Sequence, residues 1–473
     1  MMPDGPNGGN GPPSPPPPAG GPGAPSSAPP ASAPAGGGPQ GAPSPGGGST
    51  NNQWRGGGGG NNRGRRRRRG RGRRGRGPGV PGGPPGNQGG GPVFAPAPGE
   101  VLTAEGTAEG VVDVMREGYA FLRTLKHCYL PHPADVYVPA NLVRQYALEQ
   151  GTQVKGGFAP PRRPGQRASL VAVETVEDGP PQKYVDRVPF KNLVTIDPTE
   201  WLRLEGEGTS DPLLRVIDML IPIGRGQRCL IVAPPRTGKT IMLQRIGQSI
   251  NLNYPDMKVF VLLINERPEE VTELRRTIRG EIIASSLDEL APQHVGVAEM
   301  ALSRAKRCVE MGQHVVVLAD SLTRMARAYN MEIEHSGRTL SGGVDSRALE
   351  RPKAHFGAAR KVEGGGSITI IATALIDTGS RMDQIIFEEF KGTGNSEIVL
   401  SRELADRRIF PAIDISLSGT RKEEKLLPPE ILQRTWILRR VLTKMKPEEA
   451  MELLVQKLMQ TKTNAEFLDR FRG

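Results

Sequence analysis

Eight consecutive residues place the strongest constraint on how this chain can fold: Ala233-Pro234-Pro235-Arg236-Thr237-Gly238-Lys239-Thr240. They match the phosphate-binding P-loop pattern, with Ala233 in the place of its first glycine. The apolar run Cys229–Ala233 predicts a strand before the loop, and Thr240–Asn251 predicts a helix after it. In that order, backbone N–H groups converge on a phosphate. We therefore expect Lys239 to contact the β- and γ-phosphates of ATP and the Thr240 hydroxyl to bind Mg²⁺.

Apolar runs rich in Val, Ile and Leu recur after the P-loop, at Val259–Ile264, Val315–Leu318 and Ile368–Leu375. Helix-like stretches separate them, at Glu269–Ile278 and Val297–Glu310. Continuous apolar strands alternating with amphipathic helices are typical of a parallel sheet covered on both faces. The pattern predicts an α/β domain over residues 213–473.

Two acidic residues follow strands of this predicted sheet. Asp320 comes shortly after Val315–Leu318 and is a candidate Walker-B carboxylate for Mg²⁺, while Glu266 follows Val259–Ile264 and could polarise the attacking water. Taken alone, each acid is as common at a helix cap as in catalysis. With Lys239 and Thr240 they form a complete hydrolytic set, so we predict a RecA-like P-loop ATPase.

The first hundred residues differ from the rest in composition. They are mostly Gly, Pro, Ser and Asn, and such a segment cannot bury enough apolar surface to fold. They hold eleven Arg, no Lys and two acids, which gives +9 of the chain's net +12. An Arg/Gly block lies at Arg63–Arg76. We predict a disordered tail over residues 1–100, either solubilising or, as we favour, an arm that attracts nucleic-acid phosphates.

Residues 101–178 contain short alternating segments separated by Gly, Pro and charged turns. This pattern predicts a small β-barrel of the OB-fold or cold-shock type. Residues 179–212, rich in Pro and charge, predict a linker. The predicted strands are Gly110–Thr124, Ala134–Val138, Gly151–Phe158 and Ala168–Val176, with a short helix at Asn141–Glu149.

Aromatic residues of this barrel alternate with small and aliphatic ones. In Gly118–Arg123, strand alternation places Tyr119 and Phe121 on the face opposite Ala120 and Leu122. Tyr137 is similarly opposed to its neighbours Val136 and Val138. An outward patch of Tyr119, Phe121 and Tyr137 would suit stacking of unpaired bases. The alternative, that these rings fill the barrel interior, has equal weight from the pattern alone.

Cysteine usage and hydropathy bear on the compartment. Three cysteines, Cys128, Cys229 and Cys308, match no metal-ligand spacing, and an odd number suits a reducing environment. Met1–Asn10 has no apolar signal-peptide region, and the longest apolar runs, such as Ile368–Ile376, are too short to span a bilayer. We expect a cytoplasmic protein with no membrane partner.

A series of motifs in fixed order supports a family assignment. From about residue 106 to 471, the chain resembles the Rho family of bacterial transcription termination factors. The resemblance implies a homo-hexameric ring that binds pyrimidine-rich single-stranded RNA, uses ATP and Mg²⁺ for 5′→3′ RNA–DNA helicase activity, and acts on the transcription machinery. Besides the P-loop, the motifs are Pro222–Arg228, Glu266–Thr272, Asp320–Arg324, Ala326–Asn330, Leu340–Asp345, Phe390–Asn395, Ser418–Glu424 and Thr461–Asn464.

The resemblance implies nucleotide contacts that composition cannot show. Phe410 would stack on adenine, and Arg421 would be an arginine finger that reaches the neighbouring subunit's ATP, although spacing alone would make Arg421 a solvated surface charge. The catalytic set becomes Lys239, Glu266, Asp320 and Arg421. The other nucleotide-binding residues would be Gly224, Arg225, Gly226, Gln227, Arg228, Cys229, Arg236, Thr237, Gly238, Thr240, Ile241 and Arg267.

It also implies two RNA sites. The primary site on the barrel would comprise Gly118, Tyr119, Ala120, Phe121, Leu122, Arg123, Asp135, Val136 and Tyr137. Two loops would grip translocating RNA in the ring's pore, one with Arg338, Thr339, Leu340, Ser341, Gly342 and Gly343 and the other with Thr378, Gly379, Ser380 and Arg381.

Several positions depart from the family pattern. Asn265 replaces an Asp common before the catalytic Glu, which removes a negative charge near Mg²⁺. Gln166 and Ala168 stand near where an acid and an aromatic often hold a base, so a second pyrimidine pocket would be weaker. A Gly/Pro/Arg tail replaces the usual small helical domain. Arg236, Arg338 and Arg381 stand where some members have Lys, and a planar fork differs from a point charge.

Two other classes of function remain open at this stage. A rotary-type P-loop ATPase subunit shares the core but would turn over without RNA. A non-enzymatic RNA-binding protein would use the P-loop only to bind nucleotide, which the full set of Lys239, Thr240, Glu266 and Asp320 disfavours.

Overall fold

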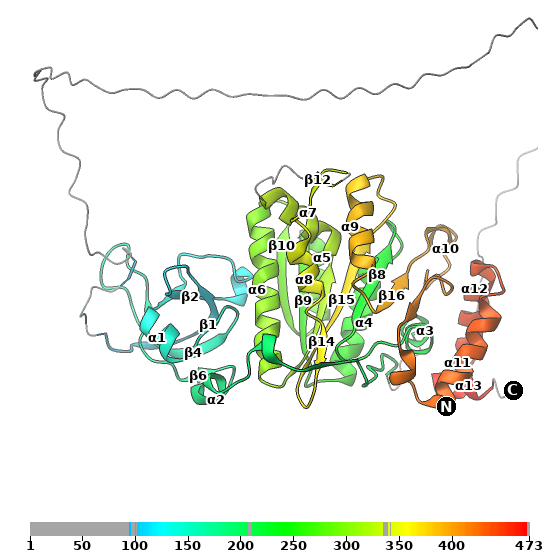
Figure 1. Cartoon of the computed structure of the whole chain (residues 1–473), viewed down its shortest axis with the longest axis horizontal. Helices are drawn as coiled ribbons and strands as arrows, with labels where there is room; N and C mark the ends of the chain where they lie inside the picture. The colour runs from blue at the N-terminus through cyan, green and yellow to red at the C-terminus, as the bar shows by residue number, and fades with distance from the viewer. Residues whose placement is uncertain are drawn as a thin grey trace, which may run out of the picture. The chain divides into compact units, whose positions relative to one another are not determined.

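The computed structural model describes residues 94–95, 100, 102–206, 211–333, 339–340 and 342–470 (Figure 1). The tail predicted to be disordered, including its Arg/Gly block, lies outside the described residues except for 94–95 and 100. Across the described ranges, no helix has the length and apolar character needed to cross a membrane.

A nine-stranded sheet forms the core of the larger domain, in the order β10-β9-β11-β15-β8-β16-β17 with β14 and β7 beyond β15. The six neighbouring strands β10, β9, β11, β15, β8 and β16 run parallel. Successive residues of β8, β9, β11 and β15 are almost all buried. Because neighbouring residues of a strand point to opposite faces, this continuous burial means that both faces are covered. The predicted α/β architecture is confirmed.

A closed five-stranded barrel precedes this domain, as predicted. β1 pairs with both β2 and β4, and the order β1-β2-β3-β5-β4 returns to β1, while β6 lies beside β4. Its interior holds aliphatic side chains such as Val112, Leu122, Val138 and Val154. The predicted first strand is in fact two strands separated by a turn at Gly118, whose φ of 85° suits glycine.

The segment predicted as a linker carries ordered structure. Tyr184 in its short helix α2 is fully buried in the barrel core, and Phe190 is buried in the core of the larger domain. Strand β7 pairs with β14 at the edge of the large sheet. The segment connects the two domains, and these two aromatic side chains pack into the core of each.

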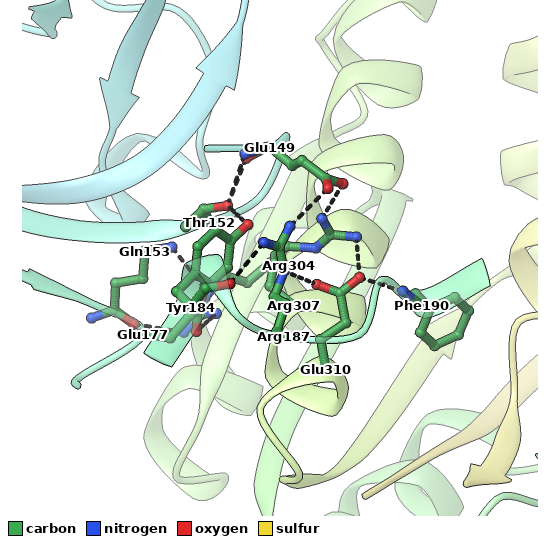
Figure 2. Close-up of polar contacts among 10 residues, drawn as sticks. All are labelled: Glu149, Thr152, Gln153, Glu177, Tyr184, Arg187, Phe190, Arg304, Arg307 and Glu310. Atoms are coloured by element: carbon green, nitrogen blue, oxygen red, sulfur yellow. Dashed lines mark hydrogen bonds and ion pairs between the residues drawn. The ribbon is translucent and has the colours of Figure 1, made fainter. Parts of the chain in front are cut away.

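Buried arginines on helix α6 fasten the barrel to the larger domain (Figure 2). The Arg304 guanidinium lies 2.6 Å from a Glu177 carboxylate oxygen and 2.6 Å from the Gln153 side-chain oxygen, both on the barrel side. Arg304 and Glu177 side chains are each 1% exposed. Burial raises the pKa of Glu177, and the Arg304 charge opposes that rise. The charged pair is therefore favoured only while both partners are present.

A second set of ion pairs continues the attachment. Arg307 bonds to Glu149 and lies 2.8 Å from Glu310, while Arg187 donates to Glu149 and Glu310 at 2.7 Å each. Glu310 also accepts the Phe190 backbone N–H at 2.6 Å. These alternating charges link α6, the barrel and the connecting segment, as Figure 2 shows.

The helices and strands have the following bounds. The barrel and connecting segment contain β1 (Gly106–Val114), β2 (Ala120–Arg123), β3 (Val136–Val138), α1 (Ala140–Gln145), β4 (Gln153–Ala159), β5 (Ser169–Leu170), β6 (Thr175–Val176), α2 (Pro181–Val185) and β7 (Thr195–Ile196). The larger domain contains α3 (Pro212–Leu220), β8 (Arg228–Ala233), α4 (Lys239–Asn253), β9 (Lys258–Glu266), α5 (Pro268–Thr277), β10 (Glu281–Ser286), α6 (Ala291–Glu310), β11 (His314–Asp320), α7 (Leu322–Glu332), β12 (Thr339–Leu340), β13 (Val344–Asp345), α8 (Glu350–Phe356), β14 (Arg360–Val362), β15 (Ser367–Leu375), α9 (Arg381–Lys391), β16 (Ser396–Val399), α10 (Arg402–Asp406), β17 (Gly419–Thr420), α11 (Pro429–Leu442), α12 (Pro447–Leu458) and α13 (Asn464–Asp469).

Removing the Arg304 charge should destabilise the protein strongly. Arg304→Met leaves the Glu177 carboxylate buried without its partner, which costs about 3–5 kcal/mol. The double variant Arg304→Met/Glu177→Gln should recover much of that loss. Urea denaturation followed by circular dichroism measures both effects.

The matched control is Arg351→Met. Its ion pair with Glu299 has an arginine side chain 72% exposed, so its loss should cost at most about 1 kcal/mol. Equal destabilisation by Arg304→Met and Arg351→Met would show that the buried pair does not hold the domains.

Candidate active site and nucleic-acid interface

The P-loop connects β8 to α4 as predicted. Gly238 forms the N-cap of α4 with φ 90°, a left-handed conformation that strains other residues. The Thr237 hydroxyl donates to the Pro234 carbonyl at 2.8 Å and closes the loop. Arg236 is exposed beside it. The loop therefore presents its backbone and the start of α4 towards one point, the geometry that binds a phosphate.

Lys239 is held between two carboxylates at the ends of neighbouring strands. Its Nζ lies 2.6 Å from Oδ2 of Asp320 and 3.5 Å from Oε1 of Glu266. Asp320 is 1% exposed, and its Oδ1 accepts a hydrogen bond of 2.7 Å from the Thr373 hydroxyl on β15. The sequence-predicted set of Lys239, Glu266 and Asp320 thus converges in space.

Glu266 is buried at the end of β9, with 1% of its surface exposed. Arg324 lies 2.8 Å from its carboxylate. Burial, and next the charge of Asp320, raise the pKa of Glu266 despite the opposing Lys239 and Arg324 cations. A carboxylate with a raised pKa next to the phosphate site has the properties of a general base.

Asn265, the departure noted beside Glu266, has a left-handed backbone with φ 56°. Asn and Asp both tolerate this conformation. Its carbonyl accepts a hydrogen bond from Arg324, the same residue that pairs with Glu266. Asn265 is the extra residue of a bulge in β9, between Ile264 and Glu266, and its backbone conformation sets the direction in which Glu266 points.

Oxygen atoms suitable for Mg²⁺ gather next to Lys239. The Thr240 hydroxyl lies 3.5 Å from Asp320 Oδ2 and 3.3 Å from Glu270 Oε2. No cluster of three or more acidic, His or Cys residues able to hold a metal ion by itself occurs among the described residues. Mg²⁺ in nucleotide sites commonly takes one or two protein oxygens, with the rest from phosphates and water. Thr240 and Asp320 therefore fit this ion.

A pocket of about 340 Å³ opens beside the P-loop. Two large apolar side chains on its wall are unusually exposed, Phe410 at 49% and Ile241 at 59%. Thr237 and Gly238 of the P-loop also line it, together with Pro212 from the start of α3. Exposed apolar walls next to a phosphate loop are suited to an aromatic base.

Gly224–Arg228 lie at the other end of β8 from the P-loop. Five residue steps along the strand amount to about 17 Å. The length of β8 therefore separates them from the P-loop of the same chain. They gather instead around Asn395, whose side-chain oxygen accepts from Gln227 and from the Arg228 backbone. Cys229 is buried inside the strand.

Arg421 belongs to this same group. Its backbone N–H donates to the Asn395 carbonyl at 2.9 Å, and its side chain is exposed. Burial lowers the pKa of Arg228, and the nearby Arg421 charge lowers it further. A cluster of arginines thus lies away from the chain's own P-loop, while Arg267 is exposed directly beside Glu266 at the start of α5.

On the barrel, the predicted alternation is confirmed. Ala120, Leu122 and Val138 belong to the barrel core, whereas Phe121 and Tyr137 do not. Tyr119, Phe121 and Tyr137 form a separate group of rings, with centroids 5.5–6.1 Å apart. The reading in which these rings fill the barrel interior is therefore wrong. Phe121 and Tyr137 are nevertheless buried.

Arg123 lies beside the ring group, as expected, but its side chain is buried. It is 4% exposed and forms ion pairs of 2.5 Å with both Asp113 and Asp135. Its guanidinium carbon lies 5.0 Å from the Phe121 ring centroid. Arg123 and Asp135 therefore support the ring group from beneath. Gly118 and Val136, at its margins, are half-buried.

The two predicted pore loops are described in part. Arg338 and Ser341 lie outside the described residues, while Thr339–Leu340 form β12, which pairs with β13 after the turn at Gly342 and Gly343. In the second loop, exposed Thr378 and Gly379 precede Ser380 and Arg381, where α9 begins. The Thr378 hydroxyl donates to Asp383, which also pairs with Arg327.

The departures at Gln166 and Ala168 both have local backbone contacts. Gln166 accepts the backbone N–H groups of Arg162 and Arg163, and the Ala168 carbonyl accepts the Tyr137 N–H at 2.8 Å. Gln166 therefore shapes its own loop, and Ala168 extends the sheet edge beside the rings without adding a ring of its own.

Comparison with known proteins identifies the family. Residues 108–182 match the Rho termination factor RNA-binding domain, and residues 214–420 match the nucleotide-binding domain of the ATP synthase alpha/beta family. Transcription termination factor Rho of Cereibacter sphaeroides is 52% identical over 76% of this chain and 86% of that protein. The chain belongs to the Rho family. Rho of Haemophilus influenzae is also 52% identical, with the same coverage of both chains.

A solved structure supports the fold of the Rho-family core. A prototypical ATPase from the type III secretion system of pathogenic bacteria superposes with a TM-score of 0.51 at 24% identity, over 60% of this chain and 88% of that one. The barrel is thus the RNA-binding domain of the Rho family, and the α/β domain is an ATPase domain that binds nucleotide.

Three residues near the Rho-family active site were not singled out from the sequence. Glu270 lies beside the Thr240 hydroxyl, Arg324 pairs with Glu266, and Thr373 bonds to Asp320. Glu270 lies in the motif Glu266–Thr272 and Arg324 in the motif Asp320–Arg324, so the sequence could have indicated both residues. Thr373 lies within an apolar strand, where only the three-dimensional register brings it to Asp320.

Glu266→Gln should retain ATP binding and lose most turnover. The amide has nearly the same shape but cannot accept a proton from water, and general-base contributions are on the order of 10²–10⁴-fold. Steady-state ATP hydrolysis with a separate nucleotide-binding assay tests this. The control is Glu269→Gln, an exposed neighbour, which should hydrolyse ATP normally.

The pH profile provides a second check. Because the pKa of Glu266 is raised, its basic form is lost at a higher pH than that of an ordinary glutamate. The wild-type kcat/KM should therefore fall on acidification, and this limb should be absent from the Gln variant. Near-normal turnover in Glu266→Gln would exclude the assignment.

Proposed function

We propose that this Rho-family protein is an RNA-dependent ATPase that moves 5′→3′ along nascent single-stranded RNA, unwinds RNA–DNA hybrids and thereby terminates transcription. The observation that carries this proposal is the presence, in one chain, of the Lys239–Asp320–Glu266 site and a ring group outside the barrel core. The first suits hydrolysis and the second suits unpaired bases.

In this proposal, residues 101–178 capture RNA and residues 213–473 form the motor. Tyr119, Phe121 and Tyr137 stack on bases, with the preference for pyrimidines that the family resemblance implies. Arg123 and Asp135 position that surface and do not contact RNA themselves, because the two side chains form an ion pair with each other. The tail, with its Arg/Gly block, attracts RNA phosphates without reading sequence.

Within the motor, each residue has a defined part. Lys239 and the P-loop backbone hold the phosphates, Phe410 and Ile241 enclose the adenine, and Glu266 takes the proton from the attacking water. Mg²⁺, when bound at Thr240 and Asp320, neutralises phosphate charge. The loops at 338–343 and 378–381 grip the translocating RNA.

A homo-hexameric ring explains why the arginine cluster lies away from its own P-loop. We propose that Arg421, with Gly224–Arg228 beside it, faces the nucleotide of a neighbouring subunit. An arginine supplied in trans stabilises charge that develops on the γ-phosphate. The Asn395 contacts hold Gln227, Arg228 and the Arg421 backbone in one unit.

The decisive test is ATP hydrolysis with and without cytosine-rich single-stranded RNA. RNA should stimulate turnover strongly, and the protein should unwind an RNA–DNA hybrid that has a 5′ single-stranded RNA overhang but not one with a 3′ overhang. Equal turnover without RNA would favour a rotary-type ATPase, and absence of hydrolysis would favour a non-enzymatic RNA-binding protein.

Subunit coupling predicts complementation. Arg421→Ala and Lys239→Ala should each abolish most RNA-stimulated hydrolysis. Rings assembled from a mixture of the two variants should regain part of it, because some interfaces then pair an intact P-loop with an intact Arg421. Full activity of Arg421→Ala alone would contradict an action in trans.

A further inference from the structure

A fourth aromatic ring lies on the ring group of the barrel. The Phe94 centroid is 5.4 Å from Phe121, 5.5 Å from Tyr119 and 5.9 Å from Tyr137. These distances and the tilted or edge-on orientations are those of favourable aromatic pairs. Phe94 therefore makes contact with every ring that we propose to bind RNA bases.

Phe94 accounts for the burial of side chains that the barrel does not bury. Phe121 and Tyr137 are only 7% and 8% exposed, yet neither belongs to the barrel core. On their outer side they contact Phe94, and Phe121 also has the Arg167 guanidinium 4.9 Å from its centroid. Most of the surface of Phe121 and Tyr137 is thus already covered.

The backbone of Phe94 is also fastened to the barrel. Its carbonyl accepts the Arg167 N–H at 3.1 Å. Arg167 in turn donates from its side chain to the His132 carbonyl at 2.7 Å and lies 3.9 Å from Asp135. One residue therefore anchors Phe94, covers Phe121 and contacts the acid that supports the ring group.

We propose that Phe94 is a tethered competitor that fills the base-stacking site and must leave before RNA bases bind there. A phenyl ring has the flat, apolar faces of a base but lacks the polar edge that a pyrimidine offers. When a segment of the same chain occupies the site, only the fraction of molecules with the site open can bind RNA. The apparent Kd is then the intrinsic Kd divided by that fraction. RNA with several stackable bases displaces Phe94, while isolated bases do not.

This inference rests on the proposed role of the ring group in RNA binding. Phe94→Ala in the full chain should tighten binding of a short oligocytidine by about threefold to tenfold, the range expected if a third to a tenth of molecules are open at rest. Phe94→Trp, a larger stacking ring, should weaken it. Fluorescence anisotropy across a salt series measures both affinities.

The salt series separates this effect from charge. Phe94 is uncharged, so wild type and Phe94→Ala should show parallel lines of log affinity against log salt, offset by a constant factor. The matched control is Trp54→Ala, which removes the other aromatic residue of the first hundred and should not tighten binding. A thermal melt of each variant confirms that it is folded.

Displacement can be observed directly with 4-fluorophenylalanine placed at position 94. Its ¹⁹F resonance should move from a ring-stacked position towards that of a solvated side chain as oligocytidine saturates the protein. A resonance that does not move would overturn the proposal, as would unchanged or weaker binding by Phe94→Ala while Phe121→Ala weakens binding. If Phe121→Ala leaves binding unchanged, the proposed RNA site itself fails.

Discussion

The carboxyl ends of parallel neighbouring strands lie at the same edge of their sheet, and this constraint brings the candidate active-site residues together. β8, β9, β11 and β15 are neighbours in one sheet, and the chain leaves each of them at the same edge. Lys239, Glu266 and Asp320 are far apart in sequence. In the fold, the Lys239 Nζ lies within 3.5 Å of a carboxylate oxygen of each acid. The like charges of these two buried acids are tolerated because Lys239 lies beside both of them and Arg324 pairs with Glu266.

In the barrel, strand geometry likewise decides where functional side chains lie. Its strands need an apolar interior, so alternate residues point outward, and on β2 and β3 those outward positions carry rings. Exposed rings cost solubility unless something covers them. Arg123 supports the rings through buried ion pairs from one side, and Phe94 covers them from the other.

Local pattern predicted the elements and the hydrolytic set because apolar periodicity and the P-loop act over a few residues. The role of Gly224–Arg228 came from the family resemblance and not from the local pattern, and the length of β8 separates these residues from the P-loop of the same chain. Thr373 and Phe94 were missed for a related reason. Both act through tertiary neighbours, and neither stands in a pattern with chemical meaning.

Helix α6 gives the molecule a mechanical property. It is a single helix of 20 residues, about 30 Å long, which packs on the catalytic sheet and holds the barrel through Arg304 and Arg307. Under the proposed function, tension on RNA held by the barrel would reach the α/β domain through this helix as well as through the connecting chain. The Arg304–Glu177 pair on this helix is buried, so separating the barrel from α6 would leave two buried charges without partners, and this cost opposes movement of one domain against the other.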